Sequence, residues 1–135
     1  MSLLIQKLLQ LLVLMLLSMH IVHVFSKRHV HVSILNSLED NLYLTVHCKS
    51  KDDDLGFQRI EHGNSYGFNF DDNFWGTTLF FCSFQWLNEF HYFDIYKYKR
   101  DHDTCVTCKW TIKKSGPCLN TDNPYNPAIC YGWNK

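Results

Sequence analysis

The sequence has little alanine and proline and no excess of either charge. Its 135 residues include 3 prolines, and Ala128 is the one alanine. Together with an aromatic content of 16%, this composition favours an all-β class. The 13 basic residues equal the 13 acidic ones, so the chain does not indicate nucleic acid or an anionic membrane as a partner.

Motifs of common enzyme classes are also missing. The sequence contains no serine nucleophile elbow, no phosphate-binding P-loop and no metalloprotease helix motif. It has no Asn-x-Ser/Thr sequon, so N-glycosylation is not expected. We therefore predict a protein that is not an enzyme and that has no catalytic residues, no metal and no cofactor.

Two less favoured interpretations concern polar residues. His91 with His47 or His102, together with Lys97, would mimic the acid–base pair of a secreted ribonuclease, but no spacing supports this pair. The acidic run at residues 52–54 suggests calcium, but carboxylates of consecutive residues rarely converge on one ion. A solvated turn is the favoured interpretation of this run.

Residues 1–26 have the features of a secretory signal peptide. Lys7 is the only charged residue, an apolar core begins at Leu8, and Ser26 is a small residue at the predicted cut. An uncleaved membrane anchor is less favoured, because polar residues interrupt the roughly 20 apolar residues that a span requires. We predict cleavage after Ser26, a secreted, extracellular product, and no stable membrane insertion after cleavage.

All six cysteines follow this segment, and an even number in a short secreted chain predicts a disulfide framework. The candidate disulfide cysteines are Cys48, Cys82, Cys105, Cys108, Cys118 and Cys130. The CxxC at residues 105–108 precedes a strand pattern, so structural pairing is favoured over redox activity or a zinc site. Positions on the predicted strands suggest the pairs Cys82–Cys108, Cys48–Cys118 and Cys105–Cys130.

Short segments with alternating apolar residues recur up to residue 119. The predicted strands are residues 29–35, 42–48, 55–61, 65–70, 77–86, 90–99 and 108–113, with 118–119 as a short additional edge. The first two are expected to form an antiparallel hairpin. This pattern, without a helical period, predicts an all-β fold: a small disulfide-stabilised antiparallel β-sandwich of seven to eight strands at residues 27–119. Residues 120–135 are expected to form a C-terminal tail tied by Cys130.

The segment at residues 73–86 is the most distinctive in the chain. Six of its side chains are Phe or Trp, and none is charged. We expect residues 77–86 to form the central strand, because Phe, Trp and Thr favour packed, pleated surfaces. Since both faces of this strand are apolar, both are expected to be covered.

Four segments resemble the plant self-incompatibility S-protein homologue family. In chain order they read LTVHCKSKDDDLG (44–56), NFWGTTLFFC (73–82), HYFDIY (91–96) and CxxCKWxIxxxGPC (105–118). The resemblance covers about residues 30–119 in the order and spacing of the family. It implies a small secreted β-sandwich with disulfides and exposed hydrophilic loops. In the founding members, proteins secreted by the pistil arrest incompatible pollen through a cell-surface partner.

The resemblance therefore implies a monomeric, secreted, non-enzymatic ligand of an unidentified cell-surface receptor protein. An apoplastic defence or inhibitor protein is the alternative, and a secreted hydrolase is less favoured. The candidate partner-binding loops are the two most charged ones. Their residues are Lys49, Lys51, Asp52, Asp53 and Asp54 in the first loop, and Lys99, Arg100, Asp101, His102 and Asp103 in the second.

Overall fold

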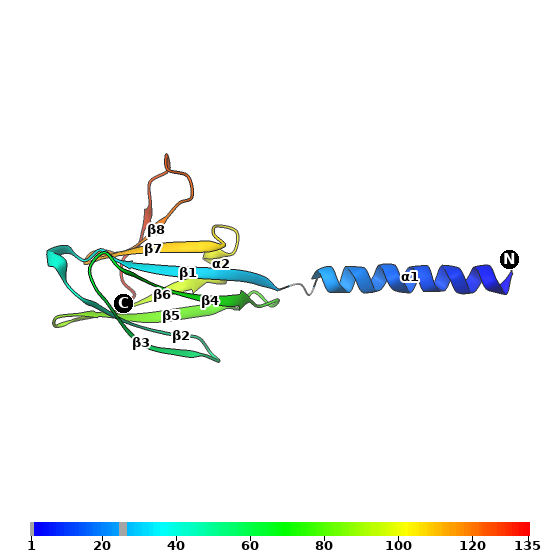
Figure 1. Cartoon of the computed structure of the whole chain (residues 1–135), viewed down its shortest axis with the longest axis horizontal. Coiled ribbons are helices and arrows are strands. Elements are labelled where there is room, and N and C mark those ends of the chain that lie inside the picture. Colours follow the sequence, from blue (N-terminus) through cyan, green and yellow to red (C-terminus); the bar gives the residue numbers. More distant parts are fainter. Residues whose placement is uncertain (1, 25–26) are drawn as a thin grey trace.

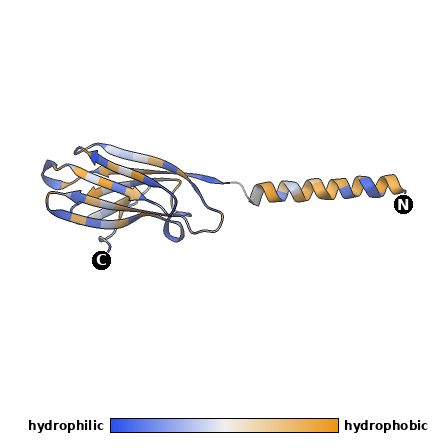
Figure 2. Cartoon of the chain, turned by 90° about the horizontal axis from the view of Figure 1, so that it is seen from below, coloured by the Kyte–Doolittle hydropathy of each residue, from blue (hydrophilic) through white to orange (hydrophobic). Residues whose placement is uncertain are grey.

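The computed structural model describes residues 2–24 and 27–135. The N-terminal helix α1 (Leu3–Val24) is apolar on almost all sides (Figures 1 and 2). Residues Leu3–Val22 have a mean hydropathy of 1.8, and by length and composition alone they could cross a membrane. A signal sequence near the N-terminus has the same properties. The predicted cut after Ser26 lies outside the described residues.

The described residues after α1 form two β-sheets that pack face to face (Figure 1). The elements are β1 (Arg28–Asn36), η1 (Glu39–Asn41), β2 (Leu44–Lys49), β3 (Asp54–Ile60), β4 (Ser65–Asp72), β5 (Leu79–Trp86), β6 (Glu89–Lys97), α2 (Tyr98–Asp101), β7 (Thr107–Lys113), β8 (Gly116–Asn120) and β9 (Ile129–Cys130). One sheet has the order β4-β1-β7-β8-β9, and the other has the order β3-β2-β5-β6. The predicted all-β fold class is confirmed, and β9 is a strand that the sequence pattern did not indicate.

The first two strands do not form the predicted hairpin. Strand β1 pairs with β4 and β7, whereas β2 pairs with β3 and β5 in the other sheet. The pair formed by β1 and β7 is parallel, so the expectation of purely antiparallel pairing is also wrong. The segment between β1 and β2 buries Leu38 completely, and this anchor carries the chain from one sheet to the other.

Asn36 fixes this crossing between the sheets. Its side chain is fully buried, and its Nδ2 donates hydrogen bonds to the carbonyl oxygens of Leu42 at 2.8 Å and Ile60 at 2.9 Å. Its Oδ1 accepts a hydrogen bond from the backbone N–H of Leu38 at 3.0 Å. One amide thus satisfies three backbone groups where the chain leaves β1.

Replacing Asn36 with alanine should lower the free energy of unfolding by about 2–4 kcal/mol, because buried polar groups lose their partners. Urea unfolding followed by tryptophan fluorescence measures this loss. Asn64→Ala is the matched control, since Asn64 is exposed and its side chain makes no hydrogen bond among the described residues. A loss for Asn36→Ala no larger than that of the control would contradict the anchoring role.

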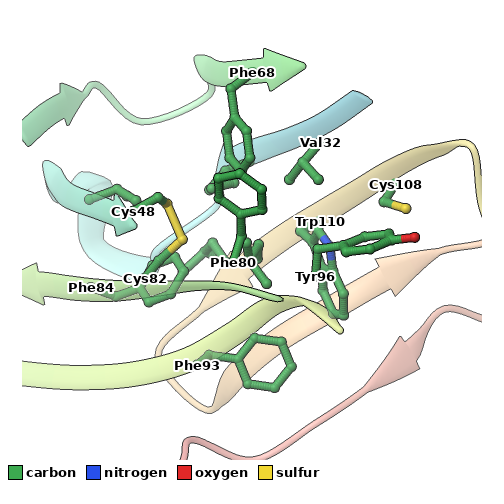
Figure 3. Close-up of a cluster of buried hydrophobic side chains, with 14 of the residues drawn as sticks. Val32, Cys48, Phe68, Phe80, Cys82, Phe84, Phe93, Tyr96, Cys108 and Trp110 are labelled. Carbon is green, nitrogen blue, oxygen red and sulfur yellow. A yellow bond between two sulfur atoms is a disulfide. The ribbon is translucent and has the colours of Figure 1, made fainter. Parts of the chain in front are cut away.

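Aromatic pairs join the two sheets in the core. The rings of Phe68 on β4 and Phe80 on β5 lie 5.1 Å apart, and those of Phe93 on β6 and Trp110 on β7 lie 5.2 Å apart (Figure 3). All four side chains are buried. Burial of large aromatic surfaces between the layers is the main contribution that holds the sheets together.

Strand β5 is central in its sheet, as predicted for residues 77–86. Phe80, Phe84 and Trp86 point inward and are buried. The prediction that both faces are covered is wrong, because Leu79 and Phe81 are 37% and 38% exposed. The outward face of β5 therefore reaches the solvent in the described structure.

Two of the three disulfides join neighbouring strands. The bonds are Cys48–Cys82, Cys105–Cys108 and Cys118–Cys130, so all three predicted pairs are wrong. Cys48 lies directly opposite Cys82 on β2 and β5, and Cys118 lies opposite Cys130 on β8 and β9. The CxxC closes on itself at the start of β7.

The residues after β8 return to the sandwich. Besides the Cys118–Cys130 bond, the Trp133 ring lies 5.2 Å from the Phe84 ring and 5.8 Å from the Trp86 ring. The backbone N–H of Asn134 donates to the carbonyl of Tyr92 on β6 at 2.9 Å. The C-terminal segment thus lies against both sheets.

Candidate functional site

The first predicted loop is a short, ordered turn between β2 and β3. Lys49 and Asp54 are partners in the strand register, so residues 50–53 alone make the turn. The N–H of Ser50 donates to the carbonyl of Asp53 at 2.8 Å, and the N–H of Asp53 donates to Ser50 Oγ at 3.1 Å. These bonds hold a conformation in which Lys51, Asp52 and Asp53 are exposed.

The two ends of this loop are already paired within the hairpin. Asp54 Oδ1 lies 2.6 Å from His47 Nε2 and accepts a hydrogen bond from the N–H of Gly56 at 2.9 Å. Lys49 Nζ lies 3.9 Å from Asp54 Oδ2. The hydrogen bond from His47, then the one from Gly56, lowers the pKa of Asp54 below its ordinary value. The charges left for a partner in this loop are those of residues 51–53.

The second predicted loop is not a free charged loop. Asp101 lies at the end of α2 and is fully buried. Its carboxylate accepts hydrogen bonds from the backbone N–H of Lys97 at 2.9 Å and from Arg100 at 2.7 and 2.8 Å. The Arg100 guanidinium lies over the rings of Phe93 and Trp110, 5.0 Å from each centroid. Arg100 and Asp101 therefore hold α2 against the core.

His102 belongs to a polar network that closes the same end of the sandwich. Its Nδ1 lies 2.8 Å from Asp72 Oδ2, which also accepts a hydrogen bond from the Tyr96 hydroxyl at 2.7 Å. Arg28 donates to the carbonyl of His102 and, at 3.4 Å, to that of Cys105. Burial, then the bond to Asp72, raises the pKa of Tyr96 far above its ordinary value. Of the second predicted loop, only Lys99 and Asp103 are exposed.

Both predicted loops lie at one end of the sandwich. Lys49 at the end of β2 is opposite Phe81, and Lys97 at the end of β6 is opposite Leu79, so both strands end beside the start of β5. The 73–78 loop enters β5 at this point, and β1 begins at the same end (Figure 1). The β2–β3 turn, the 73–78 loop and α2 are therefore neighbours on one surface.

The 73–78 loop is held by hydrogen bonds and carries an exposed aromatic side chain that lies outside the two predicted partner-binding loops. Asn73 Oδ1 accepts from the N–H of Thr77 at 3.0 Å, and the N–H of Asn73 donates to Thr78 Oγ1 at 2.7 Å. Gly76 has a φ of +71°, and a Cβ added to it would lie 2.9 Å from the Tyr98 ring. Trp75, which lies in the same loop, is 80% exposed.

The three histidines considered for acid–base chemistry lie apart in separate pairs. His47 pairs with Asp54, His102 with Asp72, and His91 with Glu89. His91 also stacks on the rings of Trp86 and Trp133, with centroids 5.1 and 5.0 Å away. Across residues 2–24 and 27–135, no group of three or more His, Cys, Asp or Glu side chains is arranged to hold a metal ion.

Comparisons with known proteins give the family. The family model described as "Plant self-incompatibility protein S1" matches residues 31–133. S-protein homolog 2 of Arabidopsis thaliana is 47% identical over 115 residues, which cover 82% of this chain and 70% of that protein. S-protein homolog 5 of the same plant is 53% identical over 90 residues, which cover 67% of each.

A solved structure has the same fold. It is described as a self-incompatibility protein homologue, from a widespread family of small, highly stable, secreted plant proteins. The TM-score is 0.59 at 18% identity, and the match covers 82% of this chain and 98% of that one. The resemblance drawn from the four sequence segments is confirmed, and the family match continues beyond residue 119. This chain belongs to the plant self-incompatibility protein S1 family, whose Arabidopsis members cited above are named S-protein homologs.

Proposed function

We propose that this protein is a secreted, monomeric, non-enzymatic ligand of a cell-surface receptor protein. Helix α1 supports secretion, because a single apolar helix at the N-terminus is what a signal peptide requires. The three disulfides of the described domain suit an oxidising, extracellular environment. Cleavage after Ser26 would release the folded domain from the membrane.

The observation that carries the proposal is the ordered, charged end of the sandwich. Its β2–β3 turn exposes residues 51–53 on a backbone held by two hydrogen bonds. A rigid scaffold with charged turns loses little conformational entropy on binding and can distinguish partners through charge. We place the receptor contact on this turn, with Lys99 and Asp103 at its edge. The side chains of Arg100, Asp101 and His102 are excluded because they are bonded within the domain.

Neutralising the turn should weaken binding to cells without unfolding the domain. The variant combines Lys51→Ser, Asp52→Asn and Asp53→Asn, and we expect roughly tenfold weaker binding, mostly through slower association, since exposed interfacial charges steer encounter. The measurement is saturable binding of labelled protein to the surface of pollen, because the family is named for self-incompatibility. Protease treatment of the pollen should abolish this binding, because the proposed receptor is a protein.

Lys113→Ser is the control variant, because Lys113 is an exposed residue at the opposite end of the sandwich. The proposal is wrong if the wild-type protein shows no saturable, protease-sensitive binding to cells of the floral tissues. The choice of loop is wrong if the triple variant binds as tightly as the wild type.

A further inference from the structure

A hollow of about 500 Å³ lies between the β2–β3 turn and the 73–78 loop. Its floor includes the apolar side chains of Leu55, Phe70 and Phe81, which are half-buried or exposed. An apolar surface open to water beside a polar rim is typical of an interaction site. The hollow lies on the end of the sandwich to which the proposed function assigns the receptor, and the inference that follows rests on that function.

The rim of the hollow is predominantly acidic. Asp52, Asp53 and Asp71 line it together with one ammonium group, that of Lys51. Asp71 pairs with His29 of β1. In the part of the chain that the structure describes, the carboxylates of Asp52 and Asp53 have neither an ion-pair nor a hydrogen-bond partner. Two unpaired carboxylates beside an apolar floor complement a segment that carries positive charge next to an apolar side chain.

The loop that forms the opposite wall also carries an aromatic ring outside the hollow that suits the same ligand. Asn73, Thr77 and Thr78 line the hollow, and the same loop carries the exposed Trp75. Tryptophan is the strongest aromatic partner of a guanidinium or ammonium group, and it is enriched among the residues that dominate interface energies. Hydrogen bonds between Asn73 and Thr77, and the small space between Gly76 and the Tyr98 ring, hold the backbone of this loop, so little backbone ordering is required when a partner binds.

We propose that this hollow binds an arginine- or lysine-bearing segment of the receptor protein. An apolar side chain of the segment covers Leu55 and Phe81, and the flanking cationic groups meet Asp52, Asp53 and the Trp75 ring. Anionic partners, including nucleic acid and acidic lipid, are disfavoured by the same carboxylates. The receptor is therefore expected to carry a binding segment in which arginine or lysine lies next to an apolar residue.

The test uses protein purified from the medium of secreting plant cells and a fluorescein-labelled octapeptide in which arginine and leucine alternate. Fluorescence anisotropy should show saturable binding. Asp52→Asn with Asp53→Asn should weaken it about 2–30-fold, because two exposed ion pairs with one segment are lost together. Trp75→Ala should weaken it about tenfold or more. Raising the salt concentration should weaken wild-type binding more than binding by the double variant.

Matched controls separate the hollow from general electrostatics. Glu61→Gln removes an exposed carboxylate beyond the far end of β3, outside the hollow, and should leave binding unchanged. A peptide with glutamate in place of arginine should not bind, and one with serine in place of leucine should bind at least tenfold more weakly. Equal binding by the wild type and the double variant, or an equal loss of binding in Glu61→Gln, overturns the proposal.

Cell binding distinguishes this inference from the proposed function. Suppose that the wild type binds pollen, and that the variant with Asp52→Asn and Asp53→Asn binds both the octapeptide and pollen as tightly as the wild type does. The hollow is then not the receptor site, and the ligand function stands. If the wild type binds the octapeptide but no cell surface, the ligand function fails. Weaker binding of the double variant to both the octapeptide and pollen supports the inference.

Discussion

Replacing Asp101 with alanine should lower the free energy of unfolding by about 3–5 kcal/mol, the cost of breaking a buried ion pair by removing one partner. The Asp101 carboxylate is fully buried and accepts hydrogen bonds from Arg100 and from the backbone N–H of Lys97. Without it, the Lys97 N–H loses its acceptor, and the Arg100 guanidinium, which lies among three aromatic rings, keeps its bond to the Asp94 carbonyl oxygen but loses its counter-charge. This loss is a large fraction of the roughly 5–15 kcal/mol by which a domain is stable, so the variant should unfold at a much lower urea concentration than the wild type.

The control is Asp103→Ala, two positions away on the same segment. Asp103 is exposed and, within the described residues, makes no ion pair, so the change should alter the free energy of unfolding by less than about 0.5 kcal/mol. Urea unfolding of both variants gives the two values. If Asp101→Ala unfolded at the urea concentration of the control, Asp101 would not anchor α2. Asp101→Asn should recover part of the loss, because the amide oxygen still accepts one hydrogen bond.

The exposure of Asp103 could be predicted from the sequence, whereas the burial of Asp101 could not. The run from residue 99 to residue 103 has the composition of a solvated loop, and its charge predicted exposure. In the structure, a short helix turns the chain so that Asp101 points into the domain. Besides Arg100 itself, the partners of this buried ion pair are backbone groups: the Lys97 N–H donates to Asp101, and the Asp94 carbonyl oxygen accepts from Arg100. Backbone groups leave no signature in side-chain chemistry.

Strand positions were predictable because alternation records burial on each strand separately. Val30, Val32 and Ile34 are buried on β1, and Cys108, Trp110 and Ile112 are buried on β7, as their period of two predicts. Alternation does not record which strands are neighbours. The parallel pairing of β1 with β7 and the crossing at Asn36 depend on contacts between distant segments.

Only part of the candidate site could be predicted from the sequence. The β2–β3 turn is exposed as its charges suggested, whereas Trp75, which precedes the predicted strand at residues 77–86, was not among the candidate partner-binding residues. Gly76 was the available signal, since a glycine just before the run allows a positive φ and a bend that turns the preceding side chain outward. The adjacent Asn73 and Thr77, which cap the bend, fit a turn rather than a strand.

The second large prediction concerns how much each of the three disulfides contributes to the free energy of unfolding. In the chain-entropy model a disulfide stabilises more when it closes a longer loop. Cys48 and Cys82 are 34 residues apart, Cys118 and Cys130 are 12 apart, and Cys105 and Cys108 are 3 apart. The expected losses on removing each bond are about 3.5–4, about 3 and about 2 kcal/mol, in that order.

Replacing both cysteines of one pair with alanine, followed by urea unfolding under oxidising conditions, measures each loss. The comparison of the Cys48–Cys82 variant with the Cys105–Cys108 variant is matched, because all four side chains are buried and each variant removes two sulfur atoms from the domain. The difference between them, about 1.5–2 kcal/mol, therefore reports loop length rather than lost packing. A loss for the Cys105–Cys108 variant as large as that for Cys48–Cys82 would mean that the short CxxC bridge orders β7 and the α2 end of the sandwich beyond its entropic effect.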